Sequence, residues 1–315
     1  MKPVIPFVPE ANSHEKDVWQ RDLANALEAF AVVKHVSDLT DRERSGAKVA
    51  IVANPDPADV AALPNLVWVQ SLWAGVERLM TELPPDGPRI VRLADPQMAE
   101  TMSEAVLAWT LYLHRDMPRY RMQQRQAVWQ EHFLKTPAER TVGVLGLGKL
   151  GSASAQRLSA NGFTVLGWSR SEKDLAGIKC FGGPQGLIPV LEQSDILVVL
   201  TPLTAETRGM LGAAEFEYCK KNAALINFAR GPIIDVDALR AALDRDQLSH
   251  AVLDVFDEEP LPPESPLWQH DKITVLPHIS APTITSTASK IVADHIRQFL
   301  TEGTIPDHVD RNRGY

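Results

Sequence analysis

Three polar residues, Arg230, Glu259 and His278, each follow a short apolar run in the second half of the chain. Arg230 lies in NFARG, Glu259 in LDVFDEEP and His278 in LPHIS. We expect the three runs to be strands of one parallel sheet, and open α/β sheets bind ligands at the carboxyl edge. A cation, a carboxylate and a group that titrates near neutrality would meet there and support acid–base chemistry. Taken singly, each residue has a structural alternative: a surface ion pair, one acid among several, or a capped loop residue.

A glycine-rich segment precedes these residues, in TVGVLGLGKLGSASAQRLSANGFTVLGWSRS. It predicts a strand, a loop, a helix and a second strand, which is the context that a dinucleotide-binding motif requires. Gly146 permits the tight turn, Gly148 lets the backbone approach a pyrophosphate at the helix N-terminus, and Gly151 lets helix and strand pack closely. The loop therefore predicts a dinucleotide site, with Lys149 and Leu150 among its contacts.

The second strand ends in GWSRS, where many dinucleotide-binding folds place an Asp or Glu for the adenosine ribose. Ser169, Arg170 and Ser171 instead offer a cation and two hydroxyl groups. This set suits the 2′-phosphate of NADP(H). We therefore expect NADP(H) to be preferred, with NAD(H) as the alternative cofactor if Arg170 only points into solvent.

Short Val- and Ile-rich runs alternate with helical patterns along most of the chain, which predicts an α/β fold with parallel sheets. The expected strands are 4–8, 32–36, 49–52, 66–70 and 90–93 in one set, and 141–145, 163–168, 196–200, 224–228, 250–253 and 273–276 in a second. The second set predicts a six-stranded Rossmann-like sheet, and a final helix over 283–302 would return to the first. We predict two Rossmann-like or flavodoxin-like domains: a substrate domain of residues 1–96 plus 284–315, and an NAD(P)-binding domain of residues 97–283 inserted into it.

A long helical pattern follows Pro96 and is expected to end or kink near Pro118. Beyond it, RYRMQQRQAVWQEHF is rich in Arg and Gln but carries Trp129 and Phe133. This segment predicts either a solvated helix or a subunit contact.

Composition excludes several classes of protein. A formal charge of −8 argues against a general nucleic-acid surface, and no apolar run approaches the roughly 20 residues that cross a bilayer. Cys180 and Cys219 lack the neighbours of a metal site. We expect a cytoplasmic protein with reduced thiols and no metal.

The ordered motifs resemble one family. Arg in an ARG turn, Glu in DVF-x-x-EP and His in PHIS, after GLGKLG and TPLTAETRGML, resemble the D-isomer-specific 2-hydroxyacid dehydrogenases over nearly the whole chain. Within the family, the chain is most similar to the glyoxylate/hydroxypyruvate reductase branch. The resemblance implies NADPH-linked reduction of a small 2-keto acid to the 2-hydroxy acid, by a homodimer formed largely through the nucleotide domain.

The chemistry explains the residue types. Reducing a ketone needs a hydride at carbon and a proton at oxygen, and His278 is suited to donate that proton near neutrality. The resemblance assigns Glu259 to the other ring nitrogen of His278, where it would raise the pKa of the imidazole. Arg230 has a planar fork that suits a carboxylate and can polarise the adjacent keto oxygen.

Further contacts are implied by the resemblance alone. Backbone N–H groups around Trp73, Ala74 and Gly75 would hold the substrate carboxylate, and the bulky Trp73 would either narrow the pocket or pack within its domain. The cofactor would contact the following residues: Met102, Leu200, Thr201, Pro202, Phe228, Ala229, Arg230, Asp254 (through the nicotinamide amide) and His278. Met102 could equally be core packing.

Two other functions stay open. One is an NAD-linked D-2-hydroxyacid dehydrogenase for a larger substrate, which Arg170 disfavours. The other is a dinucleotide-sensing interaction protein with little turnover, which the trio Arg230, Glu259 and His278 disfavours.

Overall fold

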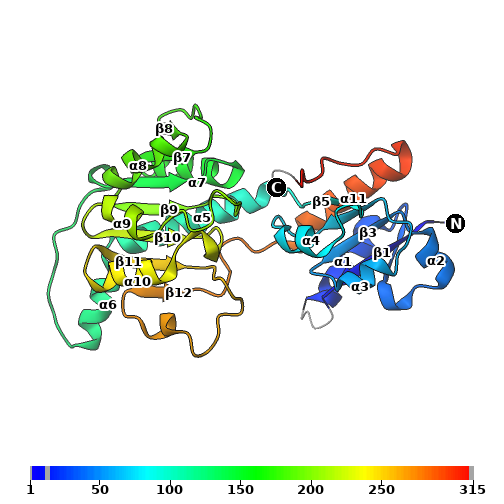
Figure 1. Ribbon diagram of the computed structural model, residues 1–315, viewed down its shortest axis with the longest axis horizontal. Coiled ribbons are helices and arrows are strands. Elements are labelled where there is room, and N and C mark those ends of the chain that lie inside the picture. The colour runs from blue at the N-terminus through cyan, green and yellow to red at the C-terminus, as the bar shows by residue number, and fades with distance from the viewer. Residues whose placement is uncertain (1, 11–14, 312–315) are drawn as a thin grey trace. The chain divides into compact units, whose positions relative to one another are not determined.

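The computed structural model describes residues 2–10 and 15–311. The chain forms two compact units, Met1–Gln97 with Thr283–Tyr315, and Met98–Pro282 (Figure 1). We call them unit 1 and unit 2. The N- and C-terminal segments of the chain therefore build one unit, and the segment between them builds the other.

Unit 1 is a five-stranded parallel sheet in the order β2-β1-β3-β4-β5, the flavodoxin-like order. Its strands are β1 (Val4–Pro9), β2 (Val32–His35), β3 (Val49–Ala53), β4 (Trp68–Ser71) and β5 (Arg89–Val91). Its helices are α1 (Lys16–Leu27), α2 (Asp41–Gly46), α3 (Pro57–Ala61), α4 (Glu77–Glu82) and α11 (Thr285–Glu302). All five expected strands are present, with ends that differ by one or two residues.

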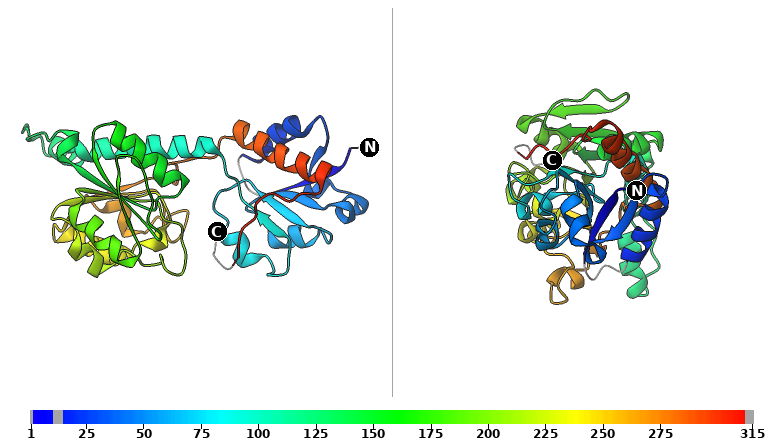
Figure 2. Two further views of the ribbon diagram at one scale, coloured as in Figure 1. Left: turned by 90° about the horizontal axis from the view of Figure 1, so that it is seen from above. Right: turned by 90° about the vertical axis from the view of Figure 1, so that its right-hand side faces the viewer.

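The sheet of unit 1 has an apolar core on each face, because alternate residues of a strand point to opposite sides. On β3, Ile51 packs with α1 and α11, whereas Val52 packs with α3 and α4. Helix α11 lies beside α1 (Figure 2), and Thr285 Oγ1 donates a hydrogen bond of 2.6 Å to Asp22 Oδ2. The C-terminal helix therefore completes the core of the N-terminal sheet.

Unit 2 is a parallel sheet in the order β12-β11-β10-β9-β6-β7-β8, in which the strand order reverses between β6 and β9. Its strands are β6 (Thr141–Leu145), β7 (Thr164–Ser169), β8 (Lys179–Gly182), β9 (Ile196–Val199), β10 (Ala223–Asn227), β11 (Leu248–Leu253) and β12 (Ile273–Val275). Its helices are α5 (Pro96–His114), α6 (Met117–Arg125), α7 (Lys149–Ala160), α8 (Leu187–Gln193), α9 (Ala213–Tyr218) and α10 (Val236–Asp244). The Rossmann-like order is as expected, but the expected count of six strands is wrong by one: β8, with the sequence KCFG, lies at an edge and is only partly buried.

Two apolar layers cover the sheet of unit 2. Leu197 and Leu225 pack with α8, α9 and α10, whereas Val198 and Ile226 pack with α5 and α7. The central strands are buried on both faces, which is typical of a parallel sheet. Loops at the carboxyl ends of these strands are therefore held on a rigid support.

The helix after Pro96 ends at His114, and Pro118 lies in the first turn of the separate helix α6. Proline suits that position because it needs no backbone donor there. Helix α6 ends at Arg125, so Trp129 and Phe133 lie beyond it, in a non-helical segment. Their side chains are 98% and 103% exposed.

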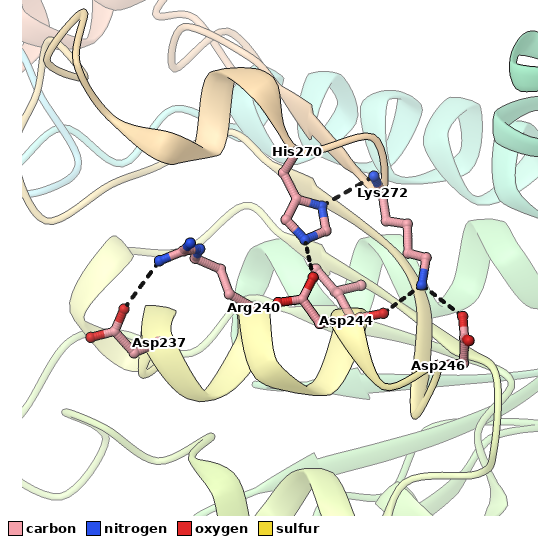
Figure 3. A network of polar contacts seen from close by, with 7 residues as sticks. Asp237, Arg240, Asp244, Asp246, His270 and Lys272 are labelled. Carbon is pink, nitrogen blue, oxygen red and sulfur yellow. Dashed lines mark hydrogen bonds and ion pairs between the residues drawn. The ribbon is translucent and has the colours of Figure 1, made fainter.

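A polar network fastens the segment before His278 to the end of α10 (Figure 3). His270 Nε2 lies 3.2 Å from Asp244 Oδ1, and Lys272 Nζ donates to Asp246 Oδ1 at 2.6 Å and to the carbonyl of Leu243. The two carboxylates are largely exposed, so solvent screens both ion pairs and they contribute little to stability. The network joins the end of α10 to the segment that leads into β12.

His250 predicts acid sensitivity of unit 2. The side chain is buried on β11, its Nε2 lies 2.9 Å from Thr274 Oγ1 on β12, and burial lowers its pKa to about 4. Below pH 6.5 His250 becomes protonated in the unfolded chain but stays neutral in the folded protein. The free energy of unfolding is therefore unaffected by His250 above pH 6.5 and decreases as the pH falls towards 4. At pH 5 the loss is about 2 kcal/mol, at 1.36 kcal/mol per pH unit. Urea unfolding at pH 7.5 and pH 5 should show this loss in the wild type and a smaller one in His250→Gln; equal losses would contradict it.

Among the described residues, none of the helices is long and apolar enough to cross a bilayer. Within the same ranges, no group of three His, Cys, Asp or Glu side chains is arranged to hold a metal ion.

Candidate active site

The glycine loop lies between β6 and α7, beside the point where the strand order reverses. Gly146 has φ +103°, a conformation that favours glycine, and a Cβ on Gly151 would lie 1.7 Å from the Gly146 carbonyl oxygen. A Cβ on Gly148 would meet nothing within 4 Å, and Gly148 caps α7 without a side-chain hydrogen bond. Helix α7, which begins with Lys149 and Leu150, therefore presents its N-terminal N–H groups to an anion. These residues fit the pyrophosphate of a dinucleotide.

The SRS segment follows β7 next to this loop. Gly146 N–H donates to Trp168 O at 2.7 Å, which ties the loop to the end of β7. Ser169 Oγ donates to the Ser171 carbonyl at 2.7 Å, and the side chains of Arg170 and Ser171 are exposed. The structure thus places the cation one residue beyond the strand, at the edge of the sheet that carries the glycine loop.

Asn227 shapes the turn that carries Arg230. Its side-chain oxygen accepts the Ala229 N–H at 3.1 Å, and its amide donates to the Arg230 carbonyl at 3.1 Å. A Cβ on Gly231 would lie 2.1 Å from the carbonyl carbon of Phe256, so glycine is required where this turn meets the segment after β11. The turn therefore brings Arg230 close to the segment that carries Glu259.

Glu259 and His278 form a hydrogen-bonded pair. His278 Nδ1 lies 2.7 Å from Glu259 Oε2, while Glu259 Oε1 accepts the Phe256 N–H at 2.8 Å. The carboxylate is thus held from two sides and fixes the imidazole. The His278 side chain is 53% exposed, so a small molecule can reach the imidazole.

Asp254 holds the backbone just after His278. It is buried at the end of β11, and its carboxylate accepts the Ile279 N–H at 2.7 Å and the Ser280 N–H at 2.9 Å. His278 itself has φ +54°, an uncommon conformation for a residue with a Cβ. The two hydrogen bonds that Asp254 accepts hold the backbone directly after His278, while the imidazole contacts Glu259.

Electrostatics poise the pair for proton transfer. The hydrogen bond to Glu259 raises the pKa of His278 above its usual value, against the opposing effects of burial and of the Arg230 charge. Burial opposes ionisation of Glu259, but the hydrogen bonds from His278 and Phe256 and the Arg230 charge together lower its pKa. The charged imidazolium is therefore favoured beside an ionised carboxylate, and Arg230 acts electrostatically on both groups.

Comparison with known proteins decides the family. Residues 107–280 match the family model described as the NAD binding domain of D-isomer specific 2-hydroxyacid dehydrogenases, which is more than half of the chain. The chain belongs to this family. It is thus an oxidoreductase, and the family predicted from the motifs is confirmed.

Solved members of the family share the whole architecture. A D-isomer specific 2-hydroxyacid dehydrogenase from Xanthobacter autotrophicus Py2, in complex with NADPH and MES, is 38% identical, with a TM-score of 0.90 over 100% of both chains. An NADPH-dependent glyoxylate/hydroxypyruvate reductase from Sinorhizobium meliloti, in complex with NADP and sulfate, is 30% identical, with a TM-score of 0.90 over 100% of both chains. A probable 2-hydroxyacid dehydrogenase from Rhizobium etli CFN 42, in complex with NADP, HEPES and L(+)-tartaric acid, is 30% identical, with a TM-score of 0.87 over 100% of both chains. The predicted fold of two parallel-sheet α/β domains is confirmed.

The other expected cofactor positions of this dehydrogenase lie around the same edge of unit 2. Leu200, Thr201 and Pro202 follow β9, and Leu200 and Thr201 lie against Gly146. The hydroxyl of Thr201 is buried without a hydrogen-bond partner in the described part of the chain, and a bound ligand would supply one.

The remaining positions are buried. Phe228 and Ala229 follow β10 and are almost fully buried, and Phe228 packs in the same core layer as Met102. Met102 lies on α5 among the apolar residues of that layer. Its surroundings are those of a core residue.

In unit 1 of the dehydrogenase, the loop after β4 carries Trp73, Ala74 and Gly75. The Trp73 indole packs against Trp19, with ring centroids 5.9 Å apart, and the Trp73 N–H donates to Ser71 Oγ at 3.0 Å. That N–H is thus already engaged within the loop. No hydrogen bond from the Ala74 or Gly75 N–H is found within residues 2–10 and 15–311, so these two groups are available to an anion.

Proposed function

We propose that this dehydrogenase reduces a small 2-keto acid, such as glyoxylate or hydroxypyruvate, to the 2-hydroxy acid with NADPH. The observation that carries the proposal is the His278–Glu259 pair, with Arg230 beside it, in a domain that also has an open dinucleotide loop. A pair of this kind supplies a proton at oxygen, which is what ketone reduction requires after hydride transfer.

The residues of unit 2 divide the chemistry among them. Gly146, Gly148 and Gly151 would hold the nicotinamide cofactor, which would supply the hydride. His278 gives the proton on Nε2 to the carbonyl oxygen and acts as the base in the reverse direction. Arg230 binds the carboxylate and polarises the carbonyl.

Unit 1 contributes to carboxylate binding in this proposal. The N–H groups of Ala74 and Gly75 are the donors, whereas the packing of Trp73 against Trp19 supports a role within unit 1 rather than as a wall of the pocket. We keep the proposed contact of Asp254 with the nicotinamide amide. The N–H groups of Ile279 and Ser280 use one acceptor site on each carboxylate oxygen, and the other sites could accept from the amide.

A cofactor preference follows from Arg170. Arg170→Asp should raise the KM for NADPH by about 10- to 100-fold and spare kcat, because a charge-assisted hydrogen bond contributes about 1.5–3 kcal/mol. The same variant should use NADH at least as well as the wild type does. Lys173→Asp makes the same change of charge three residues away and is the matched control. Equal KM values for NADPH in Arg170→Asp and Lys173→Asp would remove the argument.

The function is tested by absorbance at 340 nm with a panel of 2-keto acids and both reduced cofactors. We expect the highest kcat/KM with NADPH and glyoxylate or hydroxypyruvate. A preference for NADH and larger keto acids would favour an NAD-linked dehydrogenase of the same family. Tight NADPH binding without turnover on any keto acid would favour a sensing protein.

We further propose a cytoplasmic homodimer. The exposed Trp129 and Phe133 in the segment after α6 support a subunit contact, since large apolar side chains are rarely left in water together. Both cysteines are free, which suits a reducing compartment. Sedimentation of Trp129→Ser/Phe133→Ser should give the monomer mass where the wild type gives the dimer mass, and a monomeric wild type would contradict the assembly.

A further inference from the structure

A buried amide lies directly before the loop that we assign to the substrate carboxylate. Gln70, in β4, is 0% exposed, although the residues on both sides of it in the sheet are largely apolar. Burial of an unpaired amide costs free energy, so a buried glutamine side chain is expected to have hydrogen-bond partners.

The amide of Gln70 joins three elements of unit 1. Its Nε2 donates to the Ser71 carbonyl at 2.9 Å and lies 3.5 Å from the Val91 carbonyl of β5. Its Oε1 lies 2.8 Å from Nδ1 of His295 on α11. Because the amide nitrogen faces two carbonyls, the oxygen faces His295, whose Nδ1 therefore carries the hydrogen.

His295 suits this role. It is half-buried, and burial lowers its pKa, which favours the neutral ring. In that form one ring nitrogen carries a hydrogen, which Nδ1 donates to Gln70 Oε1. Helix α11 is packed against α1 and the sheet, so the donor comes from a rigid element.

Hydrogen bonds hold the chain between Gln70 and the proposed carboxylate site. The Trp73 N–H donates to Ser71 Oγ at 3.0 Å, and the Leu93 N–H donates to the Trp73 carbonyl at 3.0 Å. Only then come Ala74 and Gly75, whose N–H groups are available. The direction of these two donors is set by the residues that precede them.

We propose that Gln70, held by His295, is a positioning residue for the substrate carboxylate. It fixes the end of β4, and through the Ser71–Trp73 turn it sets the orientation of the Ala74 and Gly75 N–H groups. This inference rests on the proposed reduction of 2-keto acids.

The test compares glyoxylate with its uncharged methyl ester, with NADPH as cofactor. In Gln70→Leu, which keeps the size of the side chain, we expect the KM for glyoxylate to rise about tenfold, the equivalent of one misaligned hydrogen bond to a charged group. The kinetic constants for the ester and the KM for NADPH should stay near their wild-type values. A purely structural role would lower the melting temperature or weaken both substrates alike.

Variants at His295 guard against a folding defect in Gln70→Leu. His295→Asn keeps a donor near the Nδ1 position and should retain the wild-type ratio of acid to ester efficiency, whereas His295→Leu should lower it as Gln70→Leu does. If Gln70→Leu and His295→Leu both leave that ratio unchanged while the wild type reduces glyoxylate, the inference is overturned and the proposed function stands. A wild type that reduces neither substrate overturns the proposed function and the inference with it.

Discussion

We expect His278→Ala to lower kcat for the proposed 2-keto acid reduction by about 10²–10⁴-fold, because a positioned general acid contributes that much to proton transfer. NADPH binding, followed by fluorescence titration, stays near the wild-type value, since the dinucleotide loop is not altered. His270→Ala is the matched control: it removes an imidazole from the polar network of Figure 3, which does not include His278 or Glu259. Unaltered turnover in His278→Ala would rule out the acid assignment.

The hydrogen bond between His278 and Glu259 also determines how kcat/KM is expected to depend on pH. In the proposed mechanism reduction needs protonated His278, whose pKa is raised by Glu259. We therefore expect kcat/KM to be high at low pH and to fall as the pH rises through that raised pKa. Glu259→Gln removes the charge that favours the imidazolium, so the fall should move to lower pH. A fall that stays at the wild-type pH in Glu259→Gln would show that this carboxylate does not set the pKa of His278.

Arg230→Ala should raise the KM for the keto acid and lower kcat, with a combined loss in kcat/KM of about 100-fold or more. One charge-assisted hydrogen bond contributes about 1.5–3 kcal/mol, and a guanidinium can make two to a carboxylate. The Arg230 charge also lowers the pKa of His278, so its removal should move the alkaline fall of kcat/KM to higher pH, opposite to Glu259→Gln.

Arg230→Lys is the control for charge. It keeps the cation but loses the planar fork, so we expect an intermediate kcat/KM and little movement of the alkaline fall. A wild-type KM for the keto acid in Arg230→Ala would contradict the proposed role.

The sheets were predictable because central parallel strands are buried on both faces and appear as continuous apolar runs. The strand Thr141–Leu145 was predicted to the residue, and the others to within about two residues. Strand β8 was missed because KCFG is short, half-exposed and pairs on one side only, which leaves little apolar signal. The sequence did not place the end of α5 to the residue, because Pro118 is compatible both with a kink and with the first turn of a new helix.

Some site residues could be predicted from the sequence and others could not. Arg230, Glu259 and His278 could be proposed because each follows a strand in a recognisable motif, and the structure places Glu259 and His278 at hydrogen-bonding distance. The hydrogen bonds that Asp254 accepts from the backbone after His278 were not predicted. They depend on the left-handed backbone conformation of His278, which the local sequence does not indicate.

Buried amides were harder to assign. Asn227 and Gln70 act through hydrogen bonds to backbone groups and, for Gln70, to a helix more than two hundred residues away in the chain. One signal was available for both: a polar side chain at or near the end of a fully buried strand. That signal marks a position but does not identify the partner.

Isotope transfer tests the central claim most directly. The protein is mixed with glyoxylate and NADPH that carries deuterium at both C4 positions, in unlabelled water, and the product is analysed by mass spectrometry. Our account predicts glycolate with one deuterium on its hydroxyl carbon for each NADPH oxidised, because the hydride goes to carbon while His278 supplies a proton that exchanges with water. Glycolate without deuterium, or oxidation of NADPH without glycolate, would contradict it.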